Sequence, residues 1–246
     1  MPMVGLYTAD EEIASPASRP FIEANAAGAR AVLNSEPGRP TGNVVTGRKG
    51  AMFVDCEVTG IPAHSGVNHQ EGASAIEALC RKVVRMHQLT DYDSGTTVNV
   101  GLIGGGSSVN TVAPRANASI DVRFKTTEAM EAVKAKLAAI VGEVELAGTC
   151  GHITQQRYFL PLVQSQASRE LFDAYVDSAS TLGFTPRGEY SGGSADSGFT
   201  AAAGIPTLCG TGPVGGKVHT PDEWLDVSTM VPRAQALALT AMRLLR

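Results

Sequence analysis

Three acidic residues stand together near the start of the chain, at Asp10, Glu11 and Glu12. They follow an apolar run at 3–7, which predicts a short buried strand. Like charges at the end of a strand repel one another unless solvent or a cation lies between them. The cluster therefore indicates either a solvated turn or helix start, or one side of a cation site.

Two more residues add ligand types that zinc accepts. Glu36 follows a second short apolar run at 30–34, and His219 lies in the glycine-rich loop 212–220. Carboxylates and imidazole both bind zinc, and a spare carboxylate beside a ligand can act as the general base of a zinc hydrolase. Spacing alone leaves the solvated turn as the commoner arrangement for such a cluster.

Composition excludes several classes of function. The chain has 246 residues, of which 43% are hydrophobic and 18% charged, as in a globular protein of one or two domains. A net charge of −4 provides no basic surface for nucleic acid, and no apolar run reaches the length of about 18 residues that a membrane span needs. The start shows no signal-peptide pattern. We therefore expect a cytoplasmic protein with no nucleic acid or membrane partner, whose four cysteines are free, buried thiols.

The middle of the chain has a distinctive order of predicted elements. Alternating and helical spacings predict strands at 51–58, 98–102, 116–124 and 143–147, and helices at 72–87 and 127–141, the second capped by Thr127. The order β-α-β-β-α-β is typical of the ferredoxin-like arrangement, an antiparallel sheet with two helices on one face. We predict that this domain spans about 48–156 and is inserted into another domain.

The flanking segments, 1–47 and 157–246, are expected to form that other domain. They alternate strands and helices, which favours an α/β fold. The predicted elements are a helix through 21–27 capped by Ser18, a linker or crossing loop at 37–50, a helix through 171–182 and a short strand at 205–209. A terminal helix is predicted from Val227, with Val231, Leu237, Met242 and Leu245 available for the core.

Seven short motifs occur in the order found in a known family. They are the acidic stretch 8–12, Glu36-Pro37, and the segments 60–66, 109–114, 121–123, 192–196 and 219–223. Together they resemble the M20 family of zinc aminoacylases and carboxypeptidases, nearest to the glutamate carboxypeptidase subgroup. The resemblance covers essentially the whole chain. It implies an α/β catalytic domain that holds two zinc ions and a ferredoxin-like lid that forms a homodimer.

The resemblance also implies roles for the metal and base residues. Glu11 falls on the general base that activates the metal-bound water. Glu12, Glu36 and His219 fall on zinc ligands. Zinc lowers the pKa of bound water to about 7, so a neighbouring carboxylate can take its proton and pass it to the leaving amine.

Residues of the lid and of one later loop match positions that contact substrate. His64 matches a histidine that reaches the partner subunit's active site and stabilises the tetrahedral oxyanion. Asn110 and Arg123 match residues that hold the free carboxylate of a small-molecule or peptide substrate. From the residues alone, Arg123 could equally pair with Asp121 at the surface, and His64 could be an ordinary loop histidine. The resemblance further assigns a substrate-facing loop to Gly192, Gly193 and Ser194.

One part of the family pattern cannot be placed in this sequence. The family's His-x-Asp motif and a further bridging Asp would precede His64, and no earlier histidine exists. Two functions therefore remain open. The first is a hydrolase of N-acyl amino acids or C-terminal peptide bonds, seen here as part of a longer enzyme or completed by another polypeptide. The second is a non-catalytic remnant that only dimerises. We predict a hydrolase by family that is a poor catalyst as an isolated 246-residue chain.

Overall fold

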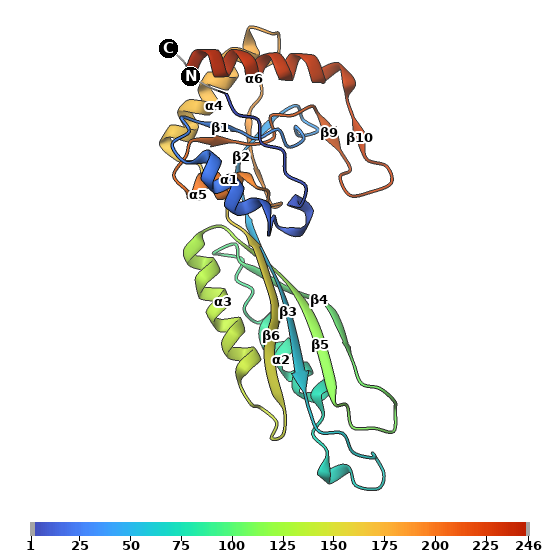
Figure 1. The fold of residues 1–246 in the computed structure, drawn as a ribbon. Coiled ribbons are helices and arrows are strands. Elements are labelled where there is room, and N and C mark those ends of the chain that lie inside the picture. Colours follow the sequence, from blue (N-terminus) through green and yellow to red (C-terminus); the bar gives the residue numbers. More distant parts are fainter. Residues whose placement is uncertain (1–2, 245–246) are drawn as a thin grey trace. The chain divides into compact units, whose positions relative to one another are not determined.

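The computed structural model describes residues 3–244 and divides into two compact units. Unit 1 contains the residues up to Gly50 and those from Phe159 onward, and unit 2 contains Ala51–Tyr158. The chain therefore leaves unit 1 once and later returns to it (Figure 1). No helix in the described range has the length and apolar character needed to cross a membrane.

Unit 2 is built on one four-stranded sheet. Its strands lie in the order β4-β5-β3-β6, and its elements are β3 (Gly50–Thr59), α2 (Ala75–His87), β4 (Thr97–Gly105), β5 (Arg115–Phe124), α3 (Thr127–Gly142) and β6 (Cys150–Phe159), with a short 3-10 turn at His69–Glu71. β4 and β5 are antiparallel, with Thr97 opposite Arg123. The β-α-β-β-α-β order with the first and third strands in the centre is ferredoxin-like.

Alternation along the central strands decides which residues form the core of unit 2. Successive side chains of a strand face opposite sides, so apolar residues two apart share one face. The residues that the alternation predicts to be buried are buried: Met52, Val54, Cys56 and Val58 of β3, and Ala116, Ala118, Ile120 and Val122 of β5. Ala51 and Phe124 are buried as well. The helices add further buried apolar residues, among them Leu79 and Met86 of α2 and Met130, Val133, Leu137 and Val141 of α3.

Two predicted boundaries in unit 2 are wrong. Thr126, not Thr127, caps α3, because its hydroxyl accepts a hydrogen bond from the backbone N–H of Ala129 at 3.2 Å. The last strand is β6, not 143–147. The carboxylates of Glu143 and Glu145 in that segment instead form ion pairs with Arg85 of α2. The segment is thus a turn after α3 that connects it to α2 through these ion pairs.

Lys82 of α2 is buried, whereas its apolar neighbour Val83 is only partly buried. Its ammonium group donates to the backbone carbonyl oxygens of Ile140 at 2.7 Å and Glu143 at 2.5 Å. The last carbonyls of a helix lack partners within the helix, and a cation there also complements the helix dipole. Lys82, on the neighbouring helix α2, thus caps the C-terminal end of α3.

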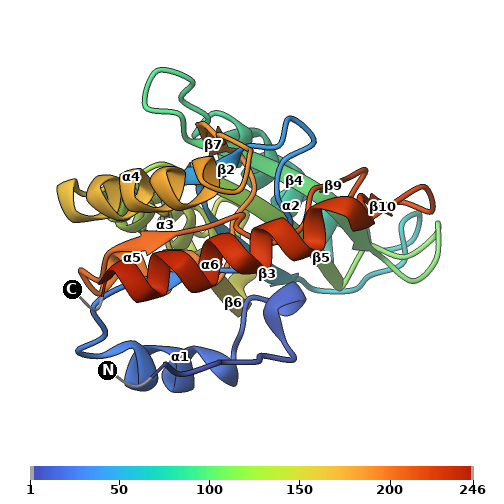
Figure 2. The same ribbon diagram turned by 90° about the horizontal axis from the view of Figure 1, so that it is seen from above.

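Unit 1 consists of short strand pairs and packed helices. Its elements are a 3-10 turn at Glu11–Ile13, α1 (Ser18–Ala26), β1 (Val32–Leu33), β2 (Val44–Arg48), α4 (Gln166–Ser180), β7 (Gly188–Ser191), α5 (Ser197–Ala202), β8 (Thr207–Leu208), β9 (Gly215–Gly216), β10 (Trp224–Leu225), a 3-10 turn at Val227–Thr229, and α6 (Met230–Leu244). β1 pairs with β8 and β2 with β7, both in parallel. α4 and α6 lie side by side (Figures 1 and 2) and enclose a core of Val44, Leu171, Tyr175, Ala179, Leu208 and Ala236.

Three predictions for the first segment of unit 1, up to Gly50, are corrected. The apolar run 3–7 is not a strand, and Met3, Val4 and Tyr7 are exposed, because no described residue pairs with it in a sheet. Ser18 is the first residue of α1 rather than its cap. The carboxylate of Asp10 does the capping, since it accepts from the backbone N–H groups of Ala17 and Ser18. The expected linker 37–50 contains β2.

The terminal helix and the cysteines also differ from expectation. Val231 and Met242 are exposed, while Arg233, Ala236 and Thr240 form the buried face of α6; Leu245 lies outside the described residues. A polar residue at each end of the buried face hides the periodicity from a hydrophobic pattern. All four cysteines are free; Cys56 and Cys209 are buried, whereas Cys80 and Cys150 are exposed.

Candidate functional site

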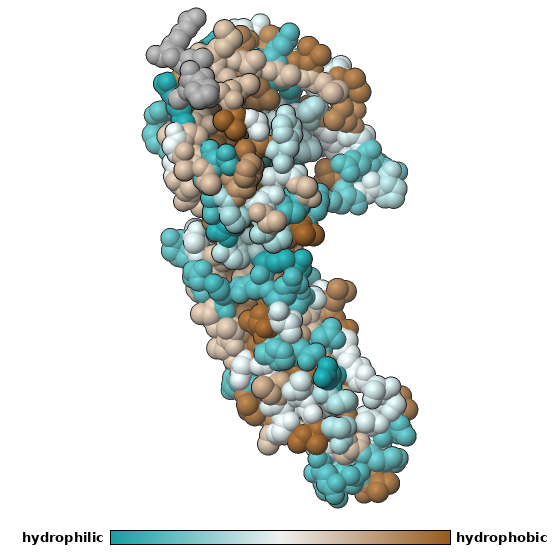
Figure 3. Space-filling view, in the orientation of Figure 1, coloured by the Kyte–Doolittle hydropathy of each residue, from teal (hydrophilic) through white to brown (hydrophobic). Residues whose placement is uncertain are grey.

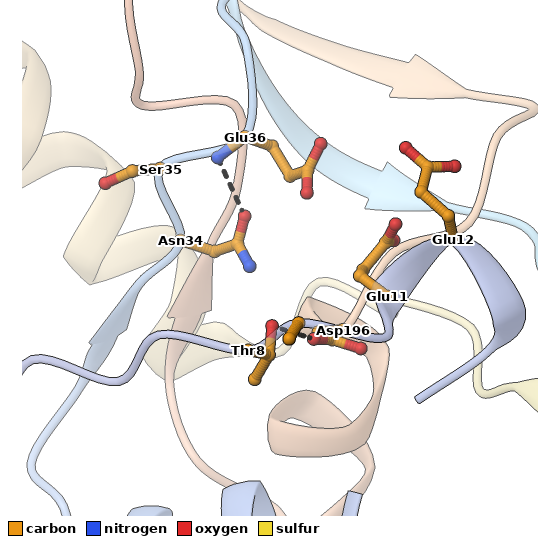
Figure 4. A pocket seen from close by; sticks show the side chains of 8 residues that line it. Thr8, Glu11, Glu12, Asn34, Ser35, Glu36 and Asp196 are labelled. Atoms are coloured by element: carbon orange, nitrogen blue, oxygen red, sulfur yellow. Dashed lines mark hydrogen bonds between the residues drawn. The ribbon is translucent and has the colours of Figure 1, made fainter. Parts of the chain in front are cut away.

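Unit 1 has an open, strongly acidic pocket of about 370 Å³. Figure 4 shows the carboxylates of Glu11, Glu12 and Glu36 directed toward a shared space, with Asp196 below them. The structure thus brings together acids from three separate segments of the sequence. The pocket is lined by Thr8, Ala9, Glu11, Glu12, Asn34, Ser35, Glu36 and Asp196.

Short local structures position these acids. Glu11 and Glu12 begin a 3-10 turn that ends in two left-handed residues, Ala14 with φ 70° and Ser15 with φ 51°. Glu36 follows β1, and its backbone N–H donates to the side-chain oxygen Oδ1 of Asn34 at 3.0 Å. Its carbonyl accepts from the N–H of Gly212 at 3.0 Å, so the Glu36 backbone is fixed on both sides.

Burial and mutual repulsion shift the pKa values of this cluster. Burial, followed by repulsion from Glu36, Asp196 and Glu12, raises the pKa of Glu11 to about 7. Burial likewise raises the pKa of Glu36, against the opposing effect of the Arg48 guanidinium. Burial also raises the pKa of Asp196, while hydrogen bonds from Ser15 and Thr8 act in the other direction. The pocket therefore favours a proton or a cation among its carboxylates.

His219 stands at the rim of this cluster. Its Nδ1 atom lies 3.9 Å from Oε2 of Glu12, and both side chains are largely exposed. The residue adopts a left-handed φ of 63° in the loop between β9 and β10. That backbone conformation is uncommon for a residue with a Cβ atom and marks the loop as a constrained turn.

The donor set fits a divalent cation in its chemistry. Carboxylates and an imidazole suit zinc, and a cation would relieve the repulsion that raises the pKa of Glu11. The donors are not arranged as a closed shell: within residues 3–244, no three or more His, Cys, Asp and Glu side chains form a group that could hold one ion. A further donor or a rearrangement is therefore needed for a complete metal site.

Sequence reasoning missed two residues that support this pocket. Asp196 closes the quoted motif 192–196, and an acid after a glycine-rich loop was a signal that could have identified it. Arg48 gave no signal, because it lies in a segment predicted as a linker. Its guanidinium donates from Nη1 to the carbonyl of Gly193 at 3.1 Å and from Nε to the Sγ atom of Cys209 at 3.2 Å. Arg48 thereby holds the loop that contains Gly192, Gly193 and Ser194.

In unit 2, His64 and Asn110 come together through two adjoining loops. His64 forms a β-bridge with Thr111, and the backbone N–H of Ser65 donates to the carbonyl of Asn110 at 3.0 Å. The Nδ1 atom of His64 accepts from the backbone N–H of Gly66 at 3.2 Å. In a neutral imidazole with this bond, the proton resides on Nε2, which leaves Nε2–H available as a donor.

Arg123 lies elsewhere in unit 2. It is near the end of β5, eight residues beyond Arg115, and eight residues of strand span about 26 Å. The Nε and Nη2 atoms of Arg123 each lie 2.7 Å from an oxygen of Asp121, and the guanidinium packs over the ring of Phe53. The Arg123–Asp121 pair that the sequence left open is therefore present. Within a single copy of unit 2, Arg123 lies far from Asn110.

Comparison with known proteins identifies relatives of both units. Residues 46–149 match the peptidase dimerisation domain of the M20 family. Carboxypeptidase G2 of Pseudomonas sp. (strain RS-16) is 25% identical over 95% of this chain and 57% of its own length. Acetylornithine deacetylase of Myxococcus xanthus is 34% identical over 45% of this chain and 31% of its own length. The chain thus spans little more than half of the longer match.

The fold agrees with solved structures as well. The aminopeptidase PepT of Bacillus cereus superposes with a TM-score of 0.71 at 22% identity, over 93% of this chain and 63% of its own length. The mixed α/β architecture with a dimerisation domain, expected from the sequence motifs, is therefore confirmed. The chain is similar to these M20 peptidases and deacetylases, and its residues 46–149 match the peptidase dimerisation domain of that family.

Proposed function

We propose that this chain carries the acidic half of the active site of a zinc-dependent hydrolase of amide bonds. The observation that carries the proposal is the pocket in which Glu11, with a pKa raised to about 7, faces Glu12 and Glu36. A carboxylate with a pKa near the working pH can both accept and return a proton. The relatives named as a carboxypeptidase and a deacetylase support amide-bond cleavage.

The roles follow from the placement of each acid. Glu11, which burial and its acidic neighbours keep partly protonated, takes a proton from the attacking water and returns it to the leaving amine. Glu12, Glu36 and His219 would hold zinc, together with donors that the described residues do not supply. The metal, when bound, would lower the pKa of water and polarise the substrate carbonyl. Arg48 holds the loop of Gly192, Gly193 and Ser194, and in this proposal that loop would face the substrate.

The lid residues would act on the substrate from a homodimer. His64 and Asn110 share one loop pair and would enter the partner's site together, where Nε2–H of His64 donates to the oxyanion. Arg123 would act in a different place, because it lies at the other end of β5. Two of its five N–H donors go to Asp121, so three remain for a substrate carboxylate.

Zinc titration of the purified chain tests this function. After dialysis against a mild chelator, calorimetry at pH 7.5 is expected to show at least one zinc ion bound per chain, with affinity lowered at least tenfold by Glu36→Gln. The matched control is Glu170→Gln, which removes an exposed acid of α4 whose carboxylate accepts a hydrogen bond from Gln166. No zinc uptake, or equal affinity in the two variants, would favour the non-catalytic alternative.

The proposed homodimer leads to a second prediction, which concerns an edge strand of the unit 2 sheet. Within residues 3–244, β4 is an edge strand that pairs with β5, and its residues Leu102 and Ile103 are 69% and 56% exposed. Figure 3 shows apolar residues among polar ones on the visible face of this unit. An unpaired edge strand with exposed apolar residues can pair with the same strand of a second copy, and a charged side chain there prevents this pairing.

Leu102→Asp is therefore expected to weaken dimerisation at least 100-fold. Light scattering after size exclusion should change from twice 25.5 kDa to 25.5 kDa. Val144→Asp is the control, because Val144 is also exposed, at 61%, but lies outside the sheet. A Leu102→Asp protein that keeps the dimer mass would place the interface elsewhere.

A further inference from the structure

One carboxylate holds both ends of the segment that bears Glu11 and Glu12. The Oγ of Ser15 donates to Oδ1 of Asp196 at 2.5 Å, and the Oγ1 of Thr8 donates to Oδ2 of the same residue at 3.2 Å. Thr8 and Ser15 stand on either side of Glu11 and Glu12 in the sequence. Figure 4 shows the hydrogen bond between Thr8 and Asp196 on the floor of the pocket, below the level of Glu11. The segment 8–15, which we call the acidic turn, is thus closed by a single side chain.

The backbone of the acidic turn needs such a restraint. Ala14 and Ser15 are both left-handed, a conformation that costs about 1–2 kcal/mol for each residue with a Cβ atom. Backbone bonds from Ala14 N to Glu11 O and from Ser15 N to Asp10 O close the turn locally. Strained residues persist only where their surroundings fix them. Ser15 is 0% exposed and Asp196 8% exposed, so water cannot take over their contact.

The same turn also starts α1. Asp10 accepts from the backbone N–H groups of Ala17 and Ser18, and Ser15 O accepts from Arg19 N. The acidic turn is therefore fixed by α1 on one side and by Asp196, at the start of α5, on the other. The carboxylates of Glu11 and Glu12 point out of this closed turn into the pocket.

We propose that Asp196 is a positioning residue that fixes the acidic turn through Thr8 and Ser15, and thereby sets where Glu11 and Glu12 present their carboxylates to a divalent cation. This inference rests on the proposed function for its cation and deepens it. Each oxygen of Asp196 accepts a hydrogen bond from a hydroxyl of the turn, and in this proposal the residue acts through those two hydroxyls. Mutating a residue that holds a metal ligand in position typically lowers metal affinity 10–100-fold.

Hydrogen exchange tests the mechanical part of the proposal without any metal. In Asp196→Ala, peptides covering 8–18 are expected to exchange at least tenfold faster than in the wild type. Ser15→Ala and the double variant Thr8→Val/Ser15→Ala should reproduce this change. Ser178→Ala is the matched control, because Ser178 is also 0% exposed but its hydroxyl donates to Ala174 O within α4. Unchanged exchange in Asp196→Ala would overturn the proposal.

Zinc calorimetry tests the consequence for the site. Asp196→Ala and the hydroxyl double variant should each bind zinc at least tenfold more weakly, and combining them should add little, because both remove the same contact. Asp196→Asn keeps one acceptor oxygen and should recover part of the affinity. Loss only in Asp196→Ala, with wild-type affinity in the hydroxyl variants, would make Asp196 a direct ligand and overturn the proposal. If the wild type takes no zinc, the proposed function fails, and the exchange result alone decides this inference.

Discussion

Replacing Glu11 by glutamine is expected to stabilise the metal-free chain at pH 8 and to leave its stability at pH 4 nearly unchanged. The folded-state pKa of Glu11 is about 7, against 4.5 for the free group. The folded state therefore holds more protons than the unfolded state between these values, so stability falls as pH rises through about 7. Glutamine resembles the protonated acid and removes this loss. We expect a gain of about 2 kcal/mol at pH 8, reduced from the full shift by solvent at this partly exposed group.

Chemical denaturation of the two proteins at pH 4, 6 and 8 measures this effect. The difference between them should grow with pH, and Glu170→Gln should show no such trend, since Glu170 lies outside the pocket on α4. If the difference in unfolding free energy between the two proteins is the same at all three pH values, the pKa of Glu11 is not raised in the folded chain. In any hydrolytically active form, the same variant should lower kcat by about 10²–10⁴, because the proton acceptor is lost.

Truncating Arg233 is expected to cost unit 1 about 3–5 kcal/mol of stability. Arg233 is 2% exposed on α6, and its guanidinium donates to the carbonyl oxygens of Gly210 and Gly42. It also packs over the ring of Phe184. Arg233→Ala leaves the buried carbonyl of Gly210 and the half-buried carbonyl of Gly42 without these donors and opens a cavity. Both losses belong to the few mechanisms that give large effects.

The Arg233→Ala substitution should also affect the acidic pocket, because Arg233 contacts the loop after β8. Gly210 precedes Gly212, whose N–H holds the backbone of Glu36, so loosening this loop should also weaken zinc binding. Arg243→Ala is the matched control on the same helix, where the exposed arginine is 3.7 Å from Asp177 and the change should cost less than about 0.5 kcal/mol. Hydrogen exchange should quicken in β2 and α4 only for Arg233→Ala. Equal effects of the two variants would contradict the prediction.

The sequence by itself determined the architecture of unit 2. The period-two alternation of 51–58 and 116–124 marked the buried face of β3 and β5, because a strand pattern is local and needs no distant residue. The ferredoxin-like order followed from it. The sequence also located Glu11, Glu12, Glu36 and His219 as acids and an imidazole at element ends, since short motifs keep their order in the chain.

Tertiary structure decided how those residues act. The contact between Ser15 and Asp196 joins residues 181 positions apart, and the pKa of Glu11 depends on burial that no local pattern records. Arg48, Lys82 and Arg233 are buried cations that hold carbonyl oxygens of distant segments, whereas a hydrophobic pattern places charged residues at the surface. The run 3–7 shows the opposite case: its residues are apolar, yet a strand forms only where a neighbouring strand completes its backbone hydrogen bonds.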